Sequence, residues 1–266
     1  MALRASRWDW LNADVSWAAF DPIAYIDHNY LYLQAGDAEI LSLIRDHFSG
    51  HCPRDRGRSI AGIDVGAGAN LYPALAMLPW CDEIALFERS PANVRYLKSQ
   101  VKSYADNWDQ FWRVLCKNEA YGALDMDPRA RFRGVVHVEE GNLFDLMLHQ
   151  GRWSMGTMFF VAESMTSSRE EFDLGVECFL RALAPGAPFA AAFMEHSHGY
   201  QTGDHSFPAC DVGMFEVELS LKRFADDVKT ERIESQTRVR DGYFAMIVAY
   251  GRRNSDGDIP QSDRDR

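Results

Sequence analysis

Residues 63–70 have the sequence Ile63-Asp64-Val65-Gly66-Ala67-Gly68-Ala69-Asn70, and residues 83–89 have the sequence Glu83-Ile84-Ala85-Leu86-Phe87-Glu88-Arg89. Together they predict a strand, a glycine turn, a helix and a second strand that ends on a carboxylate, which is how an α/β sheet binds a nucleoside. Gly66 and Gly68 let the backbone turn tightly beside a ligand, where a Cβ atom would intrude. Glu88 can accept two hydrogen bonds from the hydroxyls of a ribose.

The turn lacks the third glycine of a dinucleotide fingerprint, because Leu71 holds that position. A pyrophosphate site is therefore less favoured than a site for a smaller nucleoside ligand. S-adenosylmethionine is the leading candidate. Asp64 ends the first strand, where its carboxylate can hold the methionine ammonium group directly or through water.

The chain has 266 residues, of which 47% are hydrophobic, and its formal net charge is -11. This length and content suit one α/β domain with insertions. The acidic balance argues against nucleic acid as a substrate and suits a small neutral or cationic one. The five cysteines form no CxxC pair, so we expect reduced thiols and no structural zinc. Since no apolar run could span a bilayer and the start does not resemble a secretory signal, we predict a cytoplasmic protein without membrane contact.

Hydrophobic periodicity and turn residues divide the chain into three predicted parts. These are a helical N-terminal lid over 1–55, a core over 56–251 with insertions near 101–133 and 195–212, and a disordered polar tail over 252–266. In the core we expect strands at 59–65, 83–87, 135–138, 158–161 and 189–193, and a closing antiparallel pair at 232–238 and 243–250. Helices are expected at 72–78, 91–100, 170–183 and 211–224.

Four separated segments carry more specific signals. They are Phe20-Asp21-Pro22-Ile23-Ala24-Tyr25-Ile26-Asp27-His28-Asn29-Tyr30, the glycine turn through Tyr72, Glu88-Arg89-Ser90-Pro91-Ala92-Asn93, and Glu195-His196-Ser197-His198-Gly199-Tyr200-Gln201-Thr202-Gly203-Asp204. In this order they resemble the S-adenosylmethionine-dependent small-molecule methyltransferases typified by the nicotinamide, phenylethanolamine and thioether (indolethylamine) N-methyltransferases. The resemblance implies a Rossmann-like class I methyltransferase fold: a mostly parallel seven-stranded sheet, helices on both faces and an N-terminal helical lid.

The resemblance also implies which residues bind the cofactor. Two lid tyrosines would close over it, and the positions after the third strand would hold adenine. The implied residues are Tyr25, Tyr30, Asp64, Gly66, Ala67, Gly68, Tyr72, Glu88, Arg89, Asn93, Asn142, Leu143 and Ala162. Two positions depart from the family, because Arg89 replaces an aromatic residue and Asn142 replaces an aspartate. A guanidinium plane can stack on adenine, and the Asn142 carbonyl could accept the exocyclic amine as the aspartate does.

For the acceptor side we predict Glu163, His196 and Tyr200 as catalytic residues. Glu163 follows an apolar strand directly, at the sheet edge where ligands bind in this architecture. His196 would orient the substrate and take its proton, and Tyr200 would line the pocket. No metal is predicted, because the histidines of this loop lack a supporting acid pattern such as HExxH.

These observations favour a methyltransferase that acts on a small molecule, with N-methylation of an amine or heteroaromatic nitrogen by in-line transfer as the leading hypothesis. The product of the cofactor would be S-adenosylhomocysteine. An O- or C-methyltransferase stays open, as do two other classes: a NAD-dependent oxidoreductase and a cofactor-binding protein without catalysis. No nucleic-acid partner is expected, and a monomer is the default.

Overall fold

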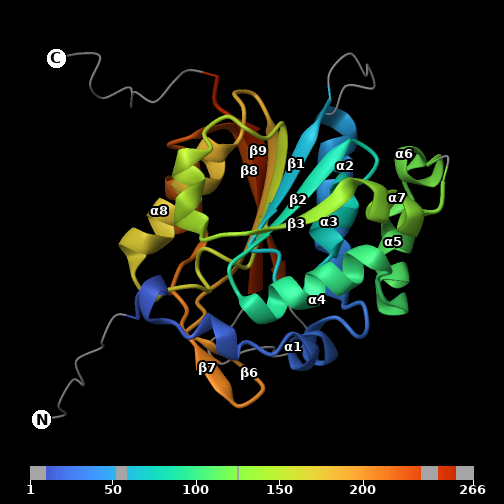
Figure 1. Cartoon of the computed structure of the whole chain (residues 1–266). Helices are drawn as coiled ribbons and strands as arrows, with labels where there is room; N and C mark the ends of the chain where they lie inside the picture. Colours follow the sequence, from blue (N-terminus) through green and yellow to red (C-terminus); the bar gives the residue numbers. More distant parts are fainter. Residues whose placement is uncertain (1–9, 52–58, 125, 235–244, 256–266) are drawn as a thin grey trace, which may run out of the picture.

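The structure is a computed structural model, and it describes residues 10–51, 59–124, 126–234 and 245–255. A seven-stranded sheet lies at its centre, with the strand order β3-β2-β1-β4-β5-β9-β8 (Figure 1). β1 to β5 are parallel, and β9 runs antiparallel to both of its neighbours, β5 and β8. The strands are β1 Ala61–Val65, β2 Glu83–Glu88, β3 Val136–Glu140, β4 Met155–Phe159, β5 Pro188–Met194, β8 Ala225–Glu234 and β9 Ala245–Arg253. The predicted mostly parallel seven-stranded sheet is confirmed.

Three expectations about strands and the tail are corrected. β4 ends before the predicted range 158–161 is complete, because Phe160 leaves the strand with a φ of 60°. β8 begins at Ala225 rather than at 232, and positions 235–238 of the predicted strand lie outside the described residues. Arg252 and Arg253 belong to β9 rather than to the polar tail, whose positions 256–266 also lie outside the described residues.

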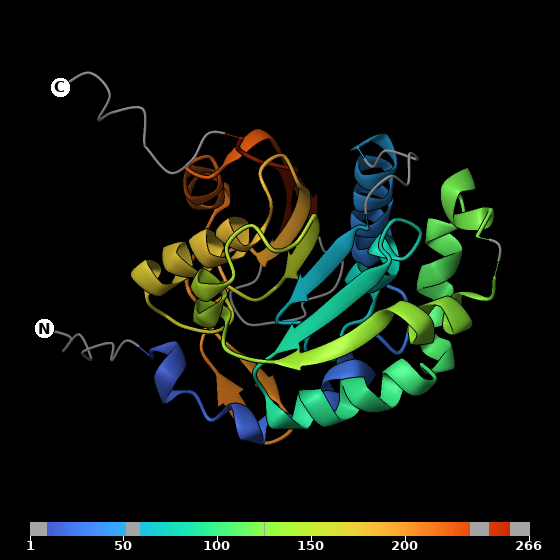
Figure 2. The same ribbon diagram turned by 45° about the horizontal axis from the view of Figure 1, so that its top comes forward.

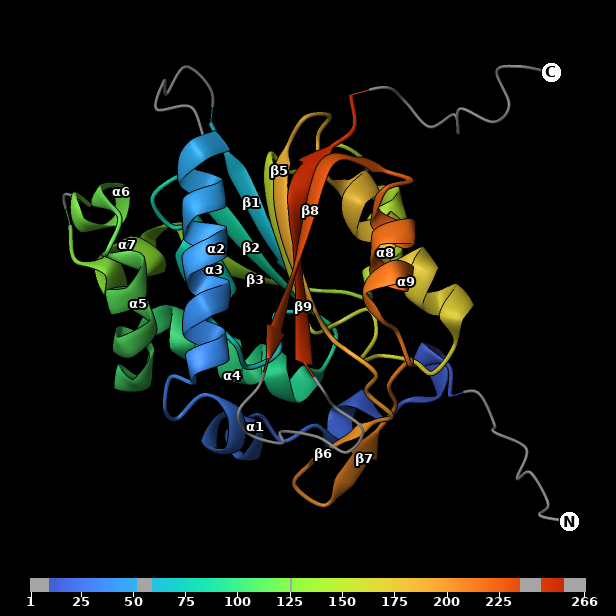
Figure 3. The same cartoon turned by 180° about the vertical axis from the view of Figure 1, so that it is seen from behind.

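Helices cover both faces of the sheet, as predicted (Figure 3). One face is covered by α2 Ala35–His51, α3 Tyr72–Met77, α4 Pro91–Lys102 and α5 Asp109–Leu115. The opposite face is covered by the 3-10 helix η4 Leu143–Leu148, α8 Arg169–Ala182 and α9 Met214–Leu221. Because both faces are covered, the central strands are buried along nearly their whole length, which explains their continuous apolar runs.

Side-chain caps fix where the helices nearest the site begin. Ser90 accepts a hydrogen bond from the Asn93 N–H and precedes Pro91, which favours the first turn of α4. Asn142 accepts from the Phe144 N–H at the start of η4, and Ser168 accepts from the Glu171 N–H at the start of α8. These caps place the residues before each helix at the carboxyl edge of the sheet.

The insertion after α4 packs against the end of the lid. It contains η3 Asp106–Trp108, α5, α6 Glu119–Gly122 and α7 Pro128–Val135. The buried rings of Trp108 and Phe111 lie 5.7 and 6.2 Å from the ring of Tyr30, between centroids. This contact fixes the end of the lid that carries Tyr30.

The lid itself consists of η1 Asn12–Asp14, η2 Trp17–Ala19 and α1 Pro22–Asn29, whereas α2 belongs to the sheet-covering layer. A hairpin of β6 Tyr200–Thr202 and β7 His205–Phe207 lies beside the lid (Figures 1 and 2). The ring of Phe207 lies 5.5 Å from that of Phe20 and is stacked at 5.6 Å on Trp17. The Thr202 hydroxyl donates to the Asp21 carbonyl at 2.8 Å and accepts from the Asp21 N–H at 3.2 Å. The 195–212 insertion and the lid therefore form one wall.

Within the residues that the structure describes, no helix is both long and apolar enough to cross a membrane.

Candidate functional site

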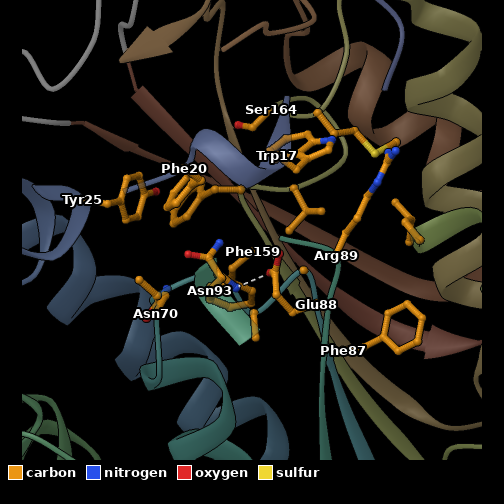
Figure 4. A pocket seen from close by; sticks show the side chains of 18 of the residues that line it. Trp17, Phe20, Tyr25, Asn70, Phe87, Glu88, Arg89, Asn93, Phe159 and Ser164 are labelled. Carbon is orange, nitrogen blue, oxygen red and sulfur yellow. Dashed lines mark hydrogen bonds between the residues drawn. The ribbon is translucent and has the colours of Figure 1, made fainter. Parts of the chain in front are cut away.

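A cavity opens at the carboxyl ends of β1, β2 and β4, between the sheet and the lid. The chain supplies its wall from the glycine turn, the ends of β2 and β3, the turn after β4, the lid and the hairpin. Figure 4 shows Glu88 near the middle, with Arg89 and Phe87 on one side and Tyr25 and Phe20 on the other. The cavity thus lies where ligands bind in open α/β sheets.

The glycine turn has the backbone that the sequence predicts. Gly66 and Gly68 have φ values of 62° and 60°, in the left-handed region that disfavours other residues. A Cβ atom at Gly66 would lie 2.6 Å from the Val161 side chain, so the turn allows no side chain there. The Gly66 N–H donates to the Phe87 carbonyl at 2.7 Å, which joins the turn to the end of β2.

Glu88 is fixed by groups on three sides. Its carboxylate accepts from the Gly68 N–H at 2.7 Å and from the Ser90 N–H at 2.6 Å, and the Asn93 side chain also donates to it. Burial raises the pKa of Glu88, and these hydrogen bonds oppose that rise. The carboxylate is therefore held at a fixed position on the cavity wall, at the carboxyl end of β2.

Both lid tyrosines line the cavity, and Figure 4 shows Tyr25 on the side opposite to Arg89. Tyr30 is 3% exposed, and its hydroxyl accepts from the Asn70 amide at 3.4 Å. Burial raises the pKa of Tyr30 well above its ordinary value. The ring of Tyr25 lies edge-on at 5.8 Å from that of Tyr30. The hydroxyls of Tyr30 and Tyr25 share a hydrogen bond, so the two polar groups lie together at the cavity wall.

Asn12 lies at the Arg89 end of the cavity and was not predicted from the sequence. It is 2% exposed, and its carbonyl accepts from the Arg89 guanidinium at 2.9 Å. Its side-chain oxygen accepts from the same guanidinium at 2.5 Å. Its side-chain NH₂ group donates to the side-chain oxygen of Asn142 at 3.1 Å. Asn12 therefore joins the two positions at which the chain departs from the family pattern.

The other end of the cavity is aromatic. Phe20 comes from the lid, Phe160 and Ser164 from the turn after β4, and Tyr200 from the hairpin. Trp17 lies between the two ends, because its indole N–H donates to Asn12 and its ring stacks on Phe207. Phe160 has a left-handed backbone, which costs on the order of 1–3 kcal/mol for a residue with a side chain. Its N–H donates to the Ala192 carbonyl at 2.7 Å, so β5 holds the turn in this conformation.

Most of the predicted site residues line this one cavity. They are Tyr25, Tyr30, Gly66, Ala67, Gly68, Glu88, Arg89, Asn93, Asn142, Leu143 and Tyr200. The structure does not bring Asp64, Tyr72, Ala162, Glu163 and His196 to its wall. Besides Asn12, the sequence reasoning missed Trp17, Phe20 and Ser164 as lining residues.

Two of the outlying residues face the protein interior. Tyr72 is fully buried, stacked on Phe111, and its hydroxyl donates to the Asp37 carboxylate at 3.2 Å. Asp64 is 1% exposed and accepts from the Thr157 hydroxyl at 2.8 Å. Burial raises the pKa of Asp64 from 3.8 to about 8. Its second oxygen has no partner among the described residues, so this carboxyl lies beneath the turn as an incompletely bonded acid.

The two residues predicted as an acid and a base are also displaced. Glu163 is fully buried, and its carboxylate accepts from the Ser164 hydroxyl at 2.9 Å and from the Met194 N–H at 3.1 Å. His196 lies at the protein surface, with Nδ1 at 2.8 Å from the Asp211 carboxylate. The Ser164 side chain, one position after Glu163, lines the cavity instead. In the described part of the chain, no group of three or more His, Cys, Asp or Glu side chains is arranged to hold a metal ion.

The geometry fits an adenosyl ligand. A left-handed glycine turn that a Cβ would fill adjoins a buried acid, and the buried Asn93 side-chain oxygen has no partner among the described residues. Such a cavity leaves room for ligand atoms at the turn and offers acceptors for ligand hydroxyls.

Comparisons with known proteins show the family and the fold. Residues 10–248 match the model of the NNMT/PNMT/TEMT family. No curated protein matches the chain. Among solved structures, a SAM-dependent methyltransferase from Methanosarcina mazei has a TM-score of 0.55 at 13% identity, over 79% of this chain and 97% of that one. The N-methyltransferase NodS from Bradyrhizobium japonicum WM9, in complex with S-adenosyl-L-homocysteine, has a TM-score of 0.52 at 11% identity, over 89% and 94%.

A third solved structure, the [4+2]-cyclase SpnF, has a TM-score of 0.51 at 14% identity, over 82% of this chain and 81% of that one. At such identities the structural likeness shows the fold alone, and a cyclase within the set illustrates why the reaction has to be argued from the site.

Proposed function

The chain belongs to the NNMT/PNMT/TEMT family and is a S-adenosylmethionine-dependent methyltransferase of the Rossmann-like class I fold, and we propose that it methylates the nitrogen of a small amine or heteroaromatic ring. S-adenosyl-L-methionine is its cofactor, which supplies an electrophilic methyl group when bound, and S-adenosyl-L-homocysteine is the product. In the proposed binding mode Glu88 accepts from the ribose hydroxyls, and Tyr25 and Tyr30 donate to the methionine carboxylate.

The observation that carries the choice of nitrogen is the chemistry of the aromatic end of the cavity. In the described part of the chain, Glu88 and Arg89 are the charged residues of the wall, and no histidine lines it. Trp17, Phe20 and Phe160 supply apolar faces near the hydroxyls of Tyr200 and Ser164. A wall of this kind favours a flat, uncharged acceptor, because a charged one would lose its hydration without gaining an ionic partner.

An uncharged nitrogen needs no base in order to attack, since its lone pair is available before the transfer. A hydroxyl acceptor would need to lose its proton, and the acid and the base predicted for that task, Glu163 and His196, lie off the cavity wall. The remaining catalytic contribution is alignment of the nitrogen with the methyl carbon and exclusion of water, worth about 7–11 kcal/mol in favourable intramolecular cases.

A neighbouring hollow suggests how the methyl acceptor reaches this end of the cavity. A second, outer hollow is lined by residues of α1 and of the hairpin, including His28 and His198. It shares Tyr25 and Tyr200 with the main cavity. We propose that the acceptor enters here and that the two tyrosines stand between the hollow and the transfer site.

The test is a methyl-transfer screen with S-adenosylmethionine labelled on its methyl group. Matched acceptors would be pyridine-type heteroaromatics, primary and secondary amines, phenols and catechols, each assayed for labelled product and for S-adenosylhomocysteine. The proposal expects labelled product from the nitrogen acceptors. Transfer to phenols with none to nitrogen compounds would overturn it.

We also propose that the protein acts in the cytoplasm as a monomer. Cys81, Cys116, Cys178 and Cys210 are free thiols, which suits a reducing compartment. Sedimentation of the purified chain would test the monomer, with a dimer as the contrary result.

A further inference from the structure

We propose that this chain reads the edge of the nucleobase with a hydrogen-bond donor, the side-chain NH₂ group of Asn142, and that Asn12 keeps that group turned toward the ligand. The inference deepens the proposed function, because the base is the adenine of the adenosyl cofactor. Its consequence is a base pocket with little preference for an amine at position 6 of the purine.

The capping geometry determines which way the Asn142 amide faces. Asn142 precedes η4, and its side-chain oxygen accepts from the Phe144 N–H at 3.3 Å. Rotating the amide by 180° would place the NH₂ group against that N–H, two donors facing each other. The Asn142 N–H donates in return to the Asp145 carboxylate at 3.0 Å, which holds the backbone of the cap. The oxygen therefore faces the helix.

Asn12 donates to the second lone pair of the Asn142 side-chain oxygen. The Asn12 NH₂ group donates to it at 3.1 Å, so both lone pairs of the Asn142 carbonyl are engaged. The Asn12 orientation is fixed in turn, because its side-chain oxygen accepts from the Arg89 guanidinium and from the Trp17 indole N–H, the latter at 3.0 Å. With the carbonyl satisfied, no acceptor on Asn142 is left for an exocyclic amine.

Displacement of Asn12 by a base would break several contacts at once. Its N–H donates to the Glu171 carboxylate of α8 at 2.7 Å, and its carbonyl accepts from the Arg89 guanidinium at 2.9 Å. Two residues before Asn12, the Trp10 N–H donates to the Ser167 hydroxyl at 2.8 Å. A single amine-to-carbonyl bond contributes about 0.5–1.5 kcal/mol net, less than these contacts together. Asn12 therefore stays in place when the cofactor binds.

What faces the ligand at this end of the cavity is a set of donors. The Asn142 NH₂ group has no partner among the residues that the structure describes, and Asn142 lines the cavity. The Arg89 guanidinium lines the same end. Donors favour the ring nitrogens of adenine and favour a carbonyl at position 6 equally well or better. An acceptor such as a carboxylate would favour the amine.

The experiment compares two ligands that differ at this position. S-adenosylhomocysteine has an amine at position 6 and S-inosylhomocysteine has a carbonyl, and their dissociation constants are measured by titration calorimetry with the full chain. For the wild type we expect the two constants to lie within about tenfold, a difference of at most about 1.4 kcal/mol. A preference for the amine ligand of more than about thirtyfold would overturn the proposal.

Substitutions test whether the two asparagines determine the relative affinity for the amine and carbonyl ligands. Asn142→Asp keeps the cap, because aspartate and asparagine cap equally well, and gives the cavity an acceptor. It should raise the preference for the amine ligand by about tenfold or more, and Asn12→Ala should shift it in the same direction by freeing a lone pair. Unchanged preference in Asn142→Asp would contradict the proposal.

Asn118→Asp is the matched control, because Asn118 caps α6 by accepting from the Ala120 N–H at 3.0 Å and does not line the cavity. It should leave both constants unchanged. If neither ligand bound the wild type, the nucleoside site itself would be refuted, which differs clearly from a large preference for one ligand.

Discussion

Replacing Glu88 with glutamine changes the acceptor pair at the centre of the cavity and leaves the size of the side chain nearly unchanged. The carboxylate accepts from the Gly68 and Ser90 N–H groups, at 2.7 and 2.6 Å, one on each oxygen. A glutamine has one oxygen, so its NH₂ group would face one of these N–H groups. The variant loses one hydrogen bond to a charged group and places two donors together.

The magnitude follows from what each state loses. A hydrogen bond to a charged group contributes about 1.5–3 kcal/mol, so losing the acceptor for one ribose hydroxyl should weaken binding by about 10- to 150-fold. Stability should also fall, because two buried donors face each other, and the removal of the desolvation cost that raises the pKa of Glu88 offsets part of this loss. We therefore expect a large loss of affinity and a modest decrease in the melting temperature.

The assay is titration calorimetry with S-adenosylhomocysteine beside thermal unfolding of the free protein. Glu140→Gln is the control, because Glu140 is the exposed register partner of Glu88 on β3 and lies off the cavity wall. A dissociation constant within about threefold of wild type, less than 0.7 kcal/mol, would refute the assignment of Glu88 to the ribose. A similar loss of affinity in Glu140→Gln would show a general charge effect instead.

Three further substitutions test the turn, the lid and the buried acid. Gly66→Ala should unfold at lower temperature and bind no S-adenosylhomocysteine in calorimetry, because φ is 62° and the new Cβ would meet Val161 at 2.6 Å; wild-type binding would contradict the tight turn. Thr202→Val removes both hydrogen bonds to Asp21, so the KM for the acceptor should rise several-fold in steady-state kinetics, while calorimetry should find S-adenosylhomocysteine affinity nearly unchanged; an unchanged KM would count against a joint wall. Asp64 has its pKa raised from 3.8 to about 8 on folding, so the native state binds more protons and stability should fall as pH rises across that window. Asp64→Asn should flatten the dependence of melting temperature on pH, and an equally steep profile in the variant would assign it to other groups.

The parts of the site that could be predicted from sequence depend on neighbouring residues. The glycine turn and the acid at the end of β2 lie in two short segments, and the turn binds that acid directly through the Gly68 N–H. Glycine adopts left-handed φ values without steric cost, so the two glycines predict the conformation observed at Gly66 and Gly68. This explains why the fold and the nucleoside half of the cavity were predictable.

The half of the cavity proposed to hold the methyl acceptor depends on a backbone conformation that the sequence does not predict. Phe160 takes a φ of 60°, which phenylalanine rarely adopts, and so redirects the chain after β4. Glu163 was predicted at the site because it directly follows an apolar strand, whereas in the structure Glu163 is buried and Ser164 lines the cavity.

Other differences come from contacts across long stretches of chain. Tyr72 starts a helix beside the glycine turn, but its ring stacks on Phe111 of the later insertion, which turns it into the core. Asn12 meets Arg89 and Asn142, which are 77 and 130 residues away in sequence. No local sequence pattern reveals these contacts, because asparagine and arginine occur at many positions of the chain and only the fold brings these three residues together.

The end of β2 couples the two halves of the cavity through three consecutive residues. Glu88 lines the cavity at the proposed ribose position, Arg89 binds Asn12, and the Ser90 hydroxyl donates to the Trp17 carbonyl at 2.8 Å. Trp17 stacks on Phe207 of the hairpin, so the wall around the acceptor rests on the strand end that recognises the nucleoside. A cofactor that fixes Glu88 therefore also stabilises the lid. Because linkage is reciprocal, an acceptor bound beneath Trp17 should strengthen cofactor binding by the same factor.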